Sequence, residues 1–171
     1  MTIIYRGRRI TLDVSRIKLP NGYEMSVEKV LFPKAVAILP IYEDNKVVLI
    51  RQFRPVIGKF IIEVPAGVVE PGENEDEALI RELREEIGAE VSSFKKLFEG
   101  FTSPGYSTEY LIIYYATIKN LGEPKPESYE VIDRVILSFD EAIEMLTRGE
   151  IYDLKTALAL TLYALKVENG G

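Results

Sequence analysis

The chain has 171 residues, of which 47% are hydrophobic and 28% are charged, and its formal net charge is −6. These values are ordinary for one globular domain with a sizeable core, and the acidic balance disfavours a nucleic-acid-binding surface, which needs a basic footprint. The sequence has neither cysteine nor histidine, which excludes disulfides, a thiolate nucleophile, an imidazole base and the usual zinc ligands.

The apolar runs are far shorter than a membrane span, and the first residues lack the apolar core of a signal peptide. We therefore expect a cytoplasmic protein with no membrane contact. Acid–base chemistry must fall to carboxylates, Lys or Tyr, and a metal site must be built from oxygen ligands.

The first third of the chain predicts strands. Residues 3–5, 8–18 and 23–31 are rich in Ile, Val, Thr and Tyr, which favour strands. Pro20-Asn21-Gly22 separates the last two as a hairpin turn, because Asn and Gly accept positive φ. We expect residues 1–33 to form an antiparallel strand region that precedes a main domain, residues 34–171.

Residues 35–42 form a nearly continuous apolar run, typical of a central strand, and residues 46–54 predict the next one. The second strand ends with Arg51 and Arg54. A guanidinium at such a strand end can bind pyrophosphate through two hydrogen bonds. Two surface charges on a sheet edge would give the same pattern.

The stretch from residue 67 to 89 predicts a glycine-rich loop followed by a helix over residues 75–87 that ends at Gly88. Apolar residues recur every four positions and give the helix a buried face. Glu82, Glu85 and Glu86 fall together on a neighbouring face. Such a cluster of oxygen ligands suits Mg²⁺ or Mn²⁺ beside substrate phosphates, although a solvated acidic face would also explain it.

Beyond this stretch, residues 94–100, 109–119 and 131–137 predict strands, and a loop rich in Pro, Gly and Glu covers residues 120–129. Ser138 and Glu141 form a capping box that opens a helix. Asp153 caps a last helix, whose predicted core face is a stripe of Leu154, Leu158, Leu162 and Leu165.

The whole spacing of the central stretch resembles the signature of the Nudix hydrolases. That signature is Gly, five residues, Glu, seven residues, then Arg-Glu-apolar-any-Glu-Glu-any-Gly-apolar. Here it reads Gly67, Glu73 and then Arg81-Glu82-Leu83-Arg84-Glu85-Glu86-Ile87-Gly88-Ala89. Its one soft departure is Ala89, where the family often has a bulkier aliphatic residue.

The resemblance implies an α+β fold, the α/β/α sandwich with a mixed sheet, here with an N-terminal antiparallel strand subdomain. It also implies that Glu82 and Glu86, with Glu85 assisting, are catalytic residues that hold two or three Mg²⁺ ions. Glu73 and Arg81 are expected to pair and brace the loop against the helix.

Two flanking segments resemble those of ADP-ribose pyrophosphatases. Arg51-Gln52-Phe53-Arg54 and Glu63-Val64-Pro65-Ala66-Gly67 precede the box, and Ser103-Pro104-Gly105-Tyr106-Ser107-Thr108-Glu109 follows it. The resemblance implies that Arg54, Glu63 and Arg51 contact substrate. It further implies a substrate contact near Pro104 and a backbone carbonyl of Ala66 that binds metal.

The catalytic base of these relatives is a glutamate on the loop before the final strand. The matching position here is Glu130, with Glu127 as the second candidate. In the same relatives an N-terminal strand region is swapped across a dimer and helps to hold the adenine, so we expect a homodimer.

The implied reaction is hydrolysis of ADP-ribose to AMP and ribose 5-phosphate. The alternatives are hydrolysis of other nucleoside diphosphate sugars or dinucleoside polyphosphates, and a non-catalytic nucleotide-binding module. Such modules have usually lost box carboxylates, which are intact here. Isopentenyl diphosphate isomerase shares the box but uses a catalytic Cys, which this chain lacks.

Overall fold

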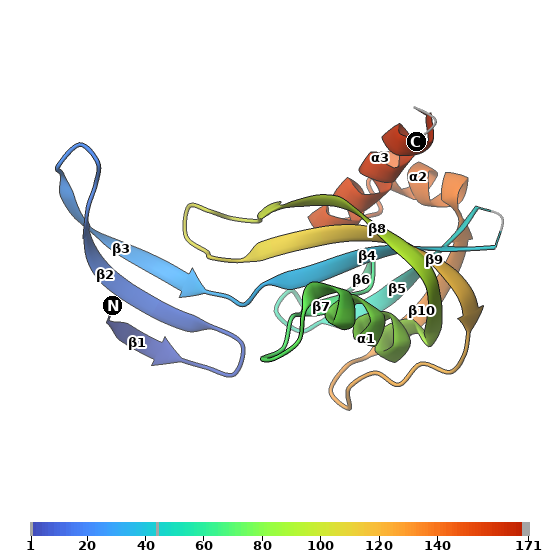
Figure 1. Cartoon of the computed structure of the whole chain (residues 1–171), viewed down its shortest axis with the longest axis horizontal. Coiled ribbons are helices and arrows are strands. Elements are labelled where there is room, and N and C mark those ends of the chain that lie inside the picture. Colours follow the sequence, from blue (N-terminus) through green and yellow to red (C-terminus); the bar gives the residue numbers. More distant parts are fainter. Residues whose placement is uncertain (1, 44, 169–171) are drawn as a thin grey trace.

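The computed structural model describes residues 2–43 and 45–168 (Figure 1). Its helices are α1 (Glu75–Ile87), α2 (Phe139–Thr147) and α3 (Leu154–Glu168). Its strands are β1 (Ile3–Arg6), β2 (Thr11–Lys18), β3 (Glu24–Leu31), β4 (Ala35–Tyr42), β5 (Lys46–Arg54), β6 (Lys59–Glu63), β7 (Ala66–Val68), β8 (Ala89–Phe101), β9 (Tyr110–Leu121) and β10 (Ile132–Ser138).

The main sheet is built around the apolar strand β4, which is buried along most of its length. The strand order is β10-β5-β4-β9-β8, with β6 paired to β5 and β7 paired to β4. Strands β4 and β9 run parallel, and the other described pairs of this sheet are antiparallel. The predicted mixed sheet is confirmed.

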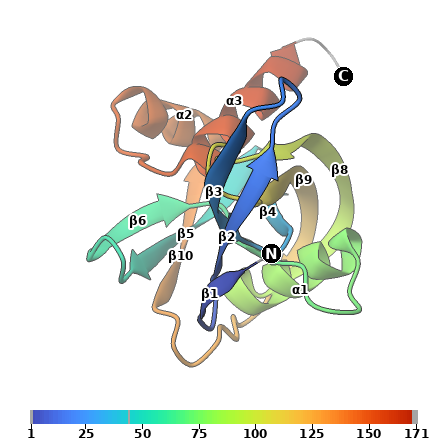
Figure 2. The same cartoon turned by 90° about the vertical axis from the view of Figure 1, so that its left-hand side faces the viewer.

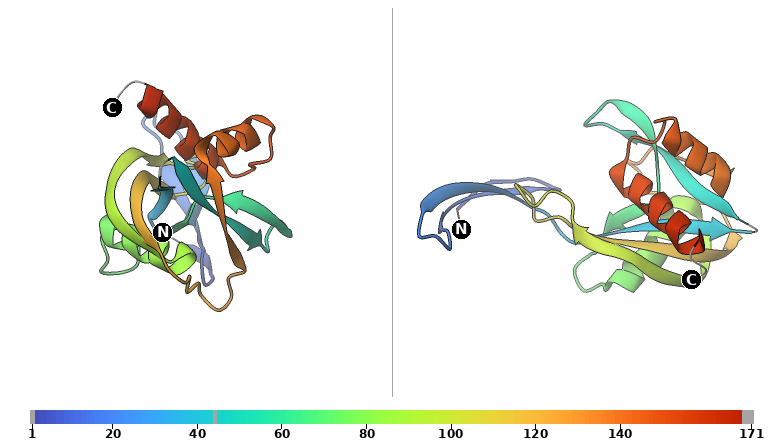
Figure 3. Two further views of the ribbon diagram at one scale, coloured as in Figure 1. Left: turned by 90° about the vertical axis from the view of Figure 1, so that its right-hand side faces the viewer. Right: turned by 90° about the horizontal axis from the view of Figure 1, so that it is seen from above.

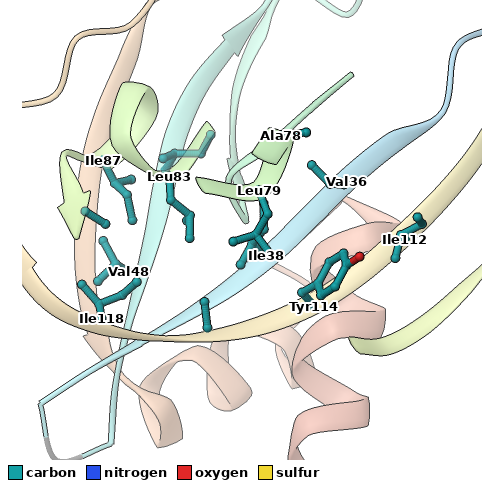
Figure 4. Close-up of a cluster of buried hydrophobic side chains, with 13 residues drawn as sticks. Val36, Ile38, Val48, Ala78, Leu79, Leu83, Ile87, Ile112, Tyr114 and Ile118 are labelled. Carbon is teal, nitrogen blue, oxygen red and sulfur yellow. The ribbon is translucent and has the colours of Figure 1, made fainter. Parts of the chain in front are cut away.

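Both faces of this sheet are covered by helices. On one face α1 places Leu79, Leu83 and Ile87 against Ile38 and other sheet residues (Figure 4). On the other face α2 and α3 pack against alternate residues of β4 and β5. The predicted α/β/α sandwich is therefore confirmed, and α1, which carries the acidic cluster, lies directly on the sheet.

Helix α1 has the predicted bounds because both its ends are capped. The side chain of Asn74 accepts hydrogen bonds from the Asp76 and Glu77 amides, and Glu77 completes a capping box. At the other end Gly88 has a φ of 69°. A Cβ there would lie 2.4 Å from the carbonyl oxygen of Gly122, so both conformation and space require glycine.

Strands β1, β2 and β3 form a separate antiparallel sheet, which we call the arm. It projects from the body of the molecule (Figures 1 and 3), and in Figure 2 it is seen in front of the body. The arm joins the body through the end of β3, where the Val30 amide donates to the Tyr106 carbonyl and the Thr108 amide donates to the Val30 carbonyl.

Three local predictions need correction. The short strand β7 overlaps the start of the predicted glycine-rich loop, and strand β8 begins at Ala89 rather than at residue 94. Strand β9 likewise continues through Leu121, into the residues predicted as loop. Long-range pairing to β4 and β9 stabilises these segments, and a local pattern does not report such pairing.

The predicted leucine stripe of α3 is not its buried face. Leu154 is 85% exposed and Leu165 is 50% exposed, whereas Thr156, Ala159 and Leu160 are fully buried. The first turn of α3 fixes which face of the helix is buried, because there the Thr156 hydroxyl accepts a hydrogen bond from the Val64 amide at 2.8 Å. Within the described residues, no helix is both long and apolar enough to span a bilayer.

Candidate active site

A cavity of about 400 Å³ opens where α1, the end of β5 and the loop before β10 meet. This volume lies in the range of small-molecule sites. Its walls bring together many of the residues that the sequence predicted for the site, namely Arg54, Ala66, Glu82, Glu85, Glu127 and Glu130. Two further predicted residues, Glu63 and Glu86, are buried beside it.

The carboxylates of Glu82 and Glu86 leave α1 one turn apart and are almost fully buried. Burial raises the pKa of Glu82 to about 7, despite the opposing charge of Arg81. Burial and the charge of Glu82 raise the pKa of Glu86 well above its ordinary value. Burial therefore disfavours the charged form of both carboxylates, and a bound cation would favour it.

Gly67 lets the backbone of β7 lie against this carboxylate pair. A Cβ at Gly67 would lie 1.7 Å from Oε1 of Glu82, so no side chain fits there. Next to it the Ala66 amide donates to Oε2 of Glu86 at 3.0 Å. The glycine of the box thus permits the close approach of backbone to carboxylate that the sequence suggested.

Arg81 braces the loop against the helix as expected. Its guanidinium donates to both carboxylate oxygens of Glu73, at 2.8 and 3.0 Å, and to the Val68 carbonyl. It also donates to Glu82 at 2.7 Å and to Glu85 at 3.3 Å. The hydrogen bonds from Arg81 lower the pKa of Glu73. Arg81 therefore holds the carboxylate face in place and partly neutralises it.

The donor set fits a hard divalent cation. Glu82, Glu85 and Glu86 supply carboxylate oxygens, and Ala66 brings backbone to the same wall. Across residues 2–43 and 45–168, no group of three acidic side chains is already arranged to hold an ion. On this wall Arg81 is paired with Glu82 and Glu85.

Arg54 and Glu63 form a two-pronged ion pair beside the carboxylate wall. Nε and Nη2 of Arg54 donate to the two oxygens of Glu63 at 2.6 and 2.7 Å. Burial by itself would raise the pKa of Glu63, but the hydrogen bond from Arg54 and the charge of Lys155 lower it on balance. Glu63 is thus a buried anion that fixes the plane of the Arg54 guanidinium.

The loop before β10 presents both candidate bases to the cavity. Glu130 is half-buried, whereas Glu127 is exposed. Burial raises the pKa of Glu130, and its side chain accepts a hydrogen bond from the Glu127 amide. The loop is fixed at both ends, because the Lys125 amide donates to the Glu85 carbonyl and the Phe53 amide donates to the Val131 carbonyl.

Two predicted substrate residues lie outside this cavity. Arg51 points away, pairs with Asp133 at 3.0 Å and stacks on the ring of Phe60. Pro104 belongs to the loop that is hydrogen-bonded to the end of β3, and it is absent from the cavity wall. Their contacts with substrate stay predictions.

The cavity also contains side chains that the sequence did not point to. Lys155 reaches it from the first turn of α3 and pairs with Glu63 and Asp153. Arg8, from the turn between β1 and β2, stacks on Tyr129 with 4.3 Å between its guanidinium carbon and the ring centroid. The contacts of Lys155 with Glu63 and of Arg8 with Tyr129 join segments far apart in sequence, so no local spacing could have shown them.

Residues 31–157 match the family model of the NUDIX domain. The chain belongs to the Nudix family. This membership confirms the prediction made from the box, and with it the prediction of an enzyme that hydrolyses phosphorus-containing anhydrides.

Relatives of this Nudix chain include proteins with different printed activities. It is 36% identical to a methanol dehydrogenase activator of Bacillus methanolicus, covering 95% of this chain and 89% of that protein. It is 33% identical, with the same coverage, to an ADP-ribose pyrophosphatase of Bacillus subtilis. It is 34% identical to a GDP-mannose pyrophosphatase of Cronobacter sakazakii, covering 90% of this chain and 84% of that protein.

Among solved structures, a crystal structure of an ADP compounds hydrolase superposes with a TM-score of 0.85. The match covers 99% of this chain and 92% of that one, at 23% sequence identity. At this identity the match supports the fold, including the N-terminal strands that lie outside the family model.

Proposed function

We propose that this Nudix hydrolase cleaves ADP-ribose to AMP and ribose 5-phosphate, with Mg²⁺ as its cofactor. The observation that carries the proposal is the pair of buried, desolvated carboxylates of Glu82 and Glu86, which adjoin a cavity that also holds the Arg54 guanidinium. The 33% identity to an ADP-ribose pyrophosphatase supports the choice of substrate.

Metal binding and diphosphate binding would fall to different residues of the site. Glu82 and Glu86, with Glu85 and the Ala66 carbonyl, would hold Mg²⁺; Mn²⁺ suits the same oxygen ligands. When bound, the cation would withdraw charge from the diphosphate and make the attacking water more acidic. Arg54, fixed by Glu63, would bind the diphosphate oxygens.

Glu130 is our candidate for the base that takes a proton from the attacking water. It lies on the cavity wall and is more buried than Glu127, so its carboxylate is less well solvated and a better proton acceptor. Glu127 keeps the second place, since it lies on the same wall.

A second substrate class has specific support. The relative named a GDP-mannose pyrophosphatase matches at 34% identity, about as well as the ADP-ribose pyrophosphatase does. Both compounds are nucleoside diphosphate sugars, so the same diphosphate-binding wall would serve either. Dinucleoside polyphosphates and a purely nucleotide-binding role remain as alternatives, the latter disfavoured by the intact box carboxylates.

The arm supports a homodimer with swapped N-terminal strands. Its strands expose apolar side chains such as Ile4 and Tyr5. The body exposes Phe98, Phe101 and Leu154 along a groove between β8 and the start of α3. We propose that the arm, residues 1–33, is a dimerisation and substrate-binding element, and that residues 34–171 form the catalytic domain. A cytoplasmic location stays a prediction.

The test is turnover of a small panel at fixed Mg²⁺, with products separated by chromatography. The panel contains ADP-ribose, GDP-mannose, a dinucleoside polyphosphate and a nucleoside triphosphate. Dominant release of AMP from ADP-ribose would support the proposal. Preference for GDP-mannose would change the proposed substrate but not the proposed type of reaction. Folded protein that turns over none of them would favour the nucleotide-binding alternative.

A further inference from the structure

Lys155 lines the cavity, and the roles proposed above do not include it. It belongs to α3, yet its Nζ pairs with Oε2 of Glu63 at the end of β6 and with Oδ1 of Asp153 at 2.8 Å. Its side chain is 16% exposed, and Glu63 is 1% exposed. Lys155 thus joins the helix on one side of the sheet to the carboxylate that holds Arg54.

A hydrogen-bonded cluster is formed by Arg54, Glu63, Asp153 and Lys155. Within it, Arg54 has more unused donors than Lys155. The Glu63 carboxylate accepts from Nε and Nη2 of Arg54 and also from Lys155. Arg54 has five N–H donors, so three remain for an anion in the cavity. Lys155 has three donors, of which two are engaged by Glu63 and Asp153.

The charges in the cluster balance. Arg54 and Lys155 carry two positive charges, and Glu63 and Asp153 carry two negative charges. Asp153 cannot turn away, because its other oxygen accepts a hydrogen bond from the Thr156 amide at 2.9 Å and caps α3. Without Lys155, two fixed carboxylates would face a single guanidinium, and the cluster would attract a diphosphate less strongly.

We propose that Lys155 is a positioning residue for the diphosphate site: it neutralises and orients Glu63, so that Arg54 presents its remaining donors to the substrate. The substrate class is a nucleoside diphosphate, and the inference rests on the proposed function in that respect. Lys155 acts on binding rather than on the chemical step, since its hydrogen bonds go to Glu63 and Asp153 and, among the described residues, to no box carboxylate.

The test compares Lys155→Met and Lys155→Arg with wild type. Two quantities are measured: the Kd for ADP by calorimetry with Mg²⁺ present, and kcat and KM for ADP-ribose. We expect Lys155→Met to raise the Kd and KM about tenfold and to leave kcat within about twofold, because a charge that supports binding is lost. Lys155→Arg keeps the charge and should restore most of the affinity.

Lys166→Met is the matched control. It removes the same charge from the far end of the same helix, where Lys166 stacks on Tyr115. It should leave the Kd for ADP unchanged. Equal weakening by both lysine variants would mean that net charge, not position, sets the affinity, and would overturn the proposal.

A double-mutant cycle with Arg54→Gln separates positioning from direct contact. If Lys155 acts through Arg54, Lys155→Met should change the Kd for ADP little once Arg54 is replaced. Additive losses would show that Lys155 binds the nucleotide independently and would overturn the positioning role. So would an unchanged Kd in Lys155→Met alone, with a lowered melting temperature as the sole effect.

The two proposals can fail separately. Wild type that binds ADP but releases no AMP from ADP-ribose would contradict the proposed substrate and leave the Lys155 test intact through ADP binding. Wild type that does not bind ADP at all would overturn the inference about Lys155.

Discussion

The body and the arm of this molecule are stabilised in different ways. The body has a buried hydrophobic cluster on each face of its sheet. In the arm, the described residues before Ala35 contribute nothing to the buried hydrophobic core, and the fully buried residue is polar, Asp13. The arm's large apolar side chains are instead exposed, namely Ile3, Ile4, Tyr5, Ile10, Ile17, Tyr23 and Met25.

In the arm, which lacks a hydrophobic core among the described residues, polar contacts of Asp13 link the strands. Its carboxylate accepts hydrogen bonds from the Thr2 amide and the Ser15 hydroxyl and pairs with Lys29 at 2.8 Å, so it ties the three strands together. A small sheet without a buried apolar face is marginal by itself. The difference teaches that the body has a hydrophobic core of its own, whereas the arm has none among the described residues; in our proposal the exposed apolar side chains of the arm pack against a partner copy.

The largest effect is expected in the body, from Glu86→Gln. Loss of this buried metal-ligand candidate should lower kcat on the order of a thousandfold. The melting temperature should not fall, because the neutral amide cannot carry the charge that burial disfavours at this position. Activity assays and thermal unfolding check both. Asp76→Asn, on the exposed side of α1, is the control, and full activity in Glu86→Gln would remove Glu86 from the ligand set.

The next largest effects compare a buried apolar residue of the body with an exposed apolar residue of the arm. Leu83→Ala in the body opens a cavity in the α1 cluster and should cost about 2–5 kcal/mol in the free energy of unfolding. Ile4→Ala in the arm removes an exposed side chain and should cost less than about 0.5 kcal/mol at a concentration where the protein is monomeric. Urea unfolding measures both. Equal losses would contradict the contrast between body and arm.

A charge in the arm should act on assembly instead. Ile4→Asp places a carboxylate on the exposed apolar surface of β1, so it should weaken a homodimer by about tenfold or more. Light scattering over a range of protein concentrations reports the mass. A wild type that is monomeric at tens of micromolar would remove the basis for this prediction.

The smallest effect concerns the pH dependence of the arm. Hydrogen bonds from Lys29 and Ser15 lower the pKa of Asp13 to about 2, from 3.8. A lowered carboxyl pKa contributes stability that is present above the unfolded value and is lost as pH falls through the folded value. Asp13→Asn should therefore speed amide hydrogen exchange in β2 at neutral pH, and the difference should shrink between pH 4 and pH 2. A difference that stays constant over this range would contradict the role of the Asp13 charge.

Much of the body could be predicted from the sequence because its signals are local. The bounds of α1 follow from Asn74, Glu77 and Gly88, and the buried face follows from apolar residues four apart. The carboxylate face needed no tertiary information either, since Glu82 and Glu86 lie one helical turn apart.

What could not be predicted depends on contacts between distant segments. The rotation of α3 is set by Thr156 and Lys155, which bind Val64 and Glu63 more than ninety residues earlier. The stripe that begins at Leu154 correctly predicted a helix, but these leucines do not lie on its buried face. The cation–π contact of Arg8 with Tyr129 joins the arm to the loop before β10, and neither residue carried a pattern that pointed to the other.

The central claim is that the acidic face of α1 is a cation-dependent hydrolytic site, and the rate of AMP release from ADP-ribose during a Mg²⁺ titration tests it most directly. We expect no release in EDTA and a rate that rises with Mg²⁺ until it saturates. Release at the full rate in EDTA, or no release at any Mg²⁺ concentration by the folded protein, would contradict the claim.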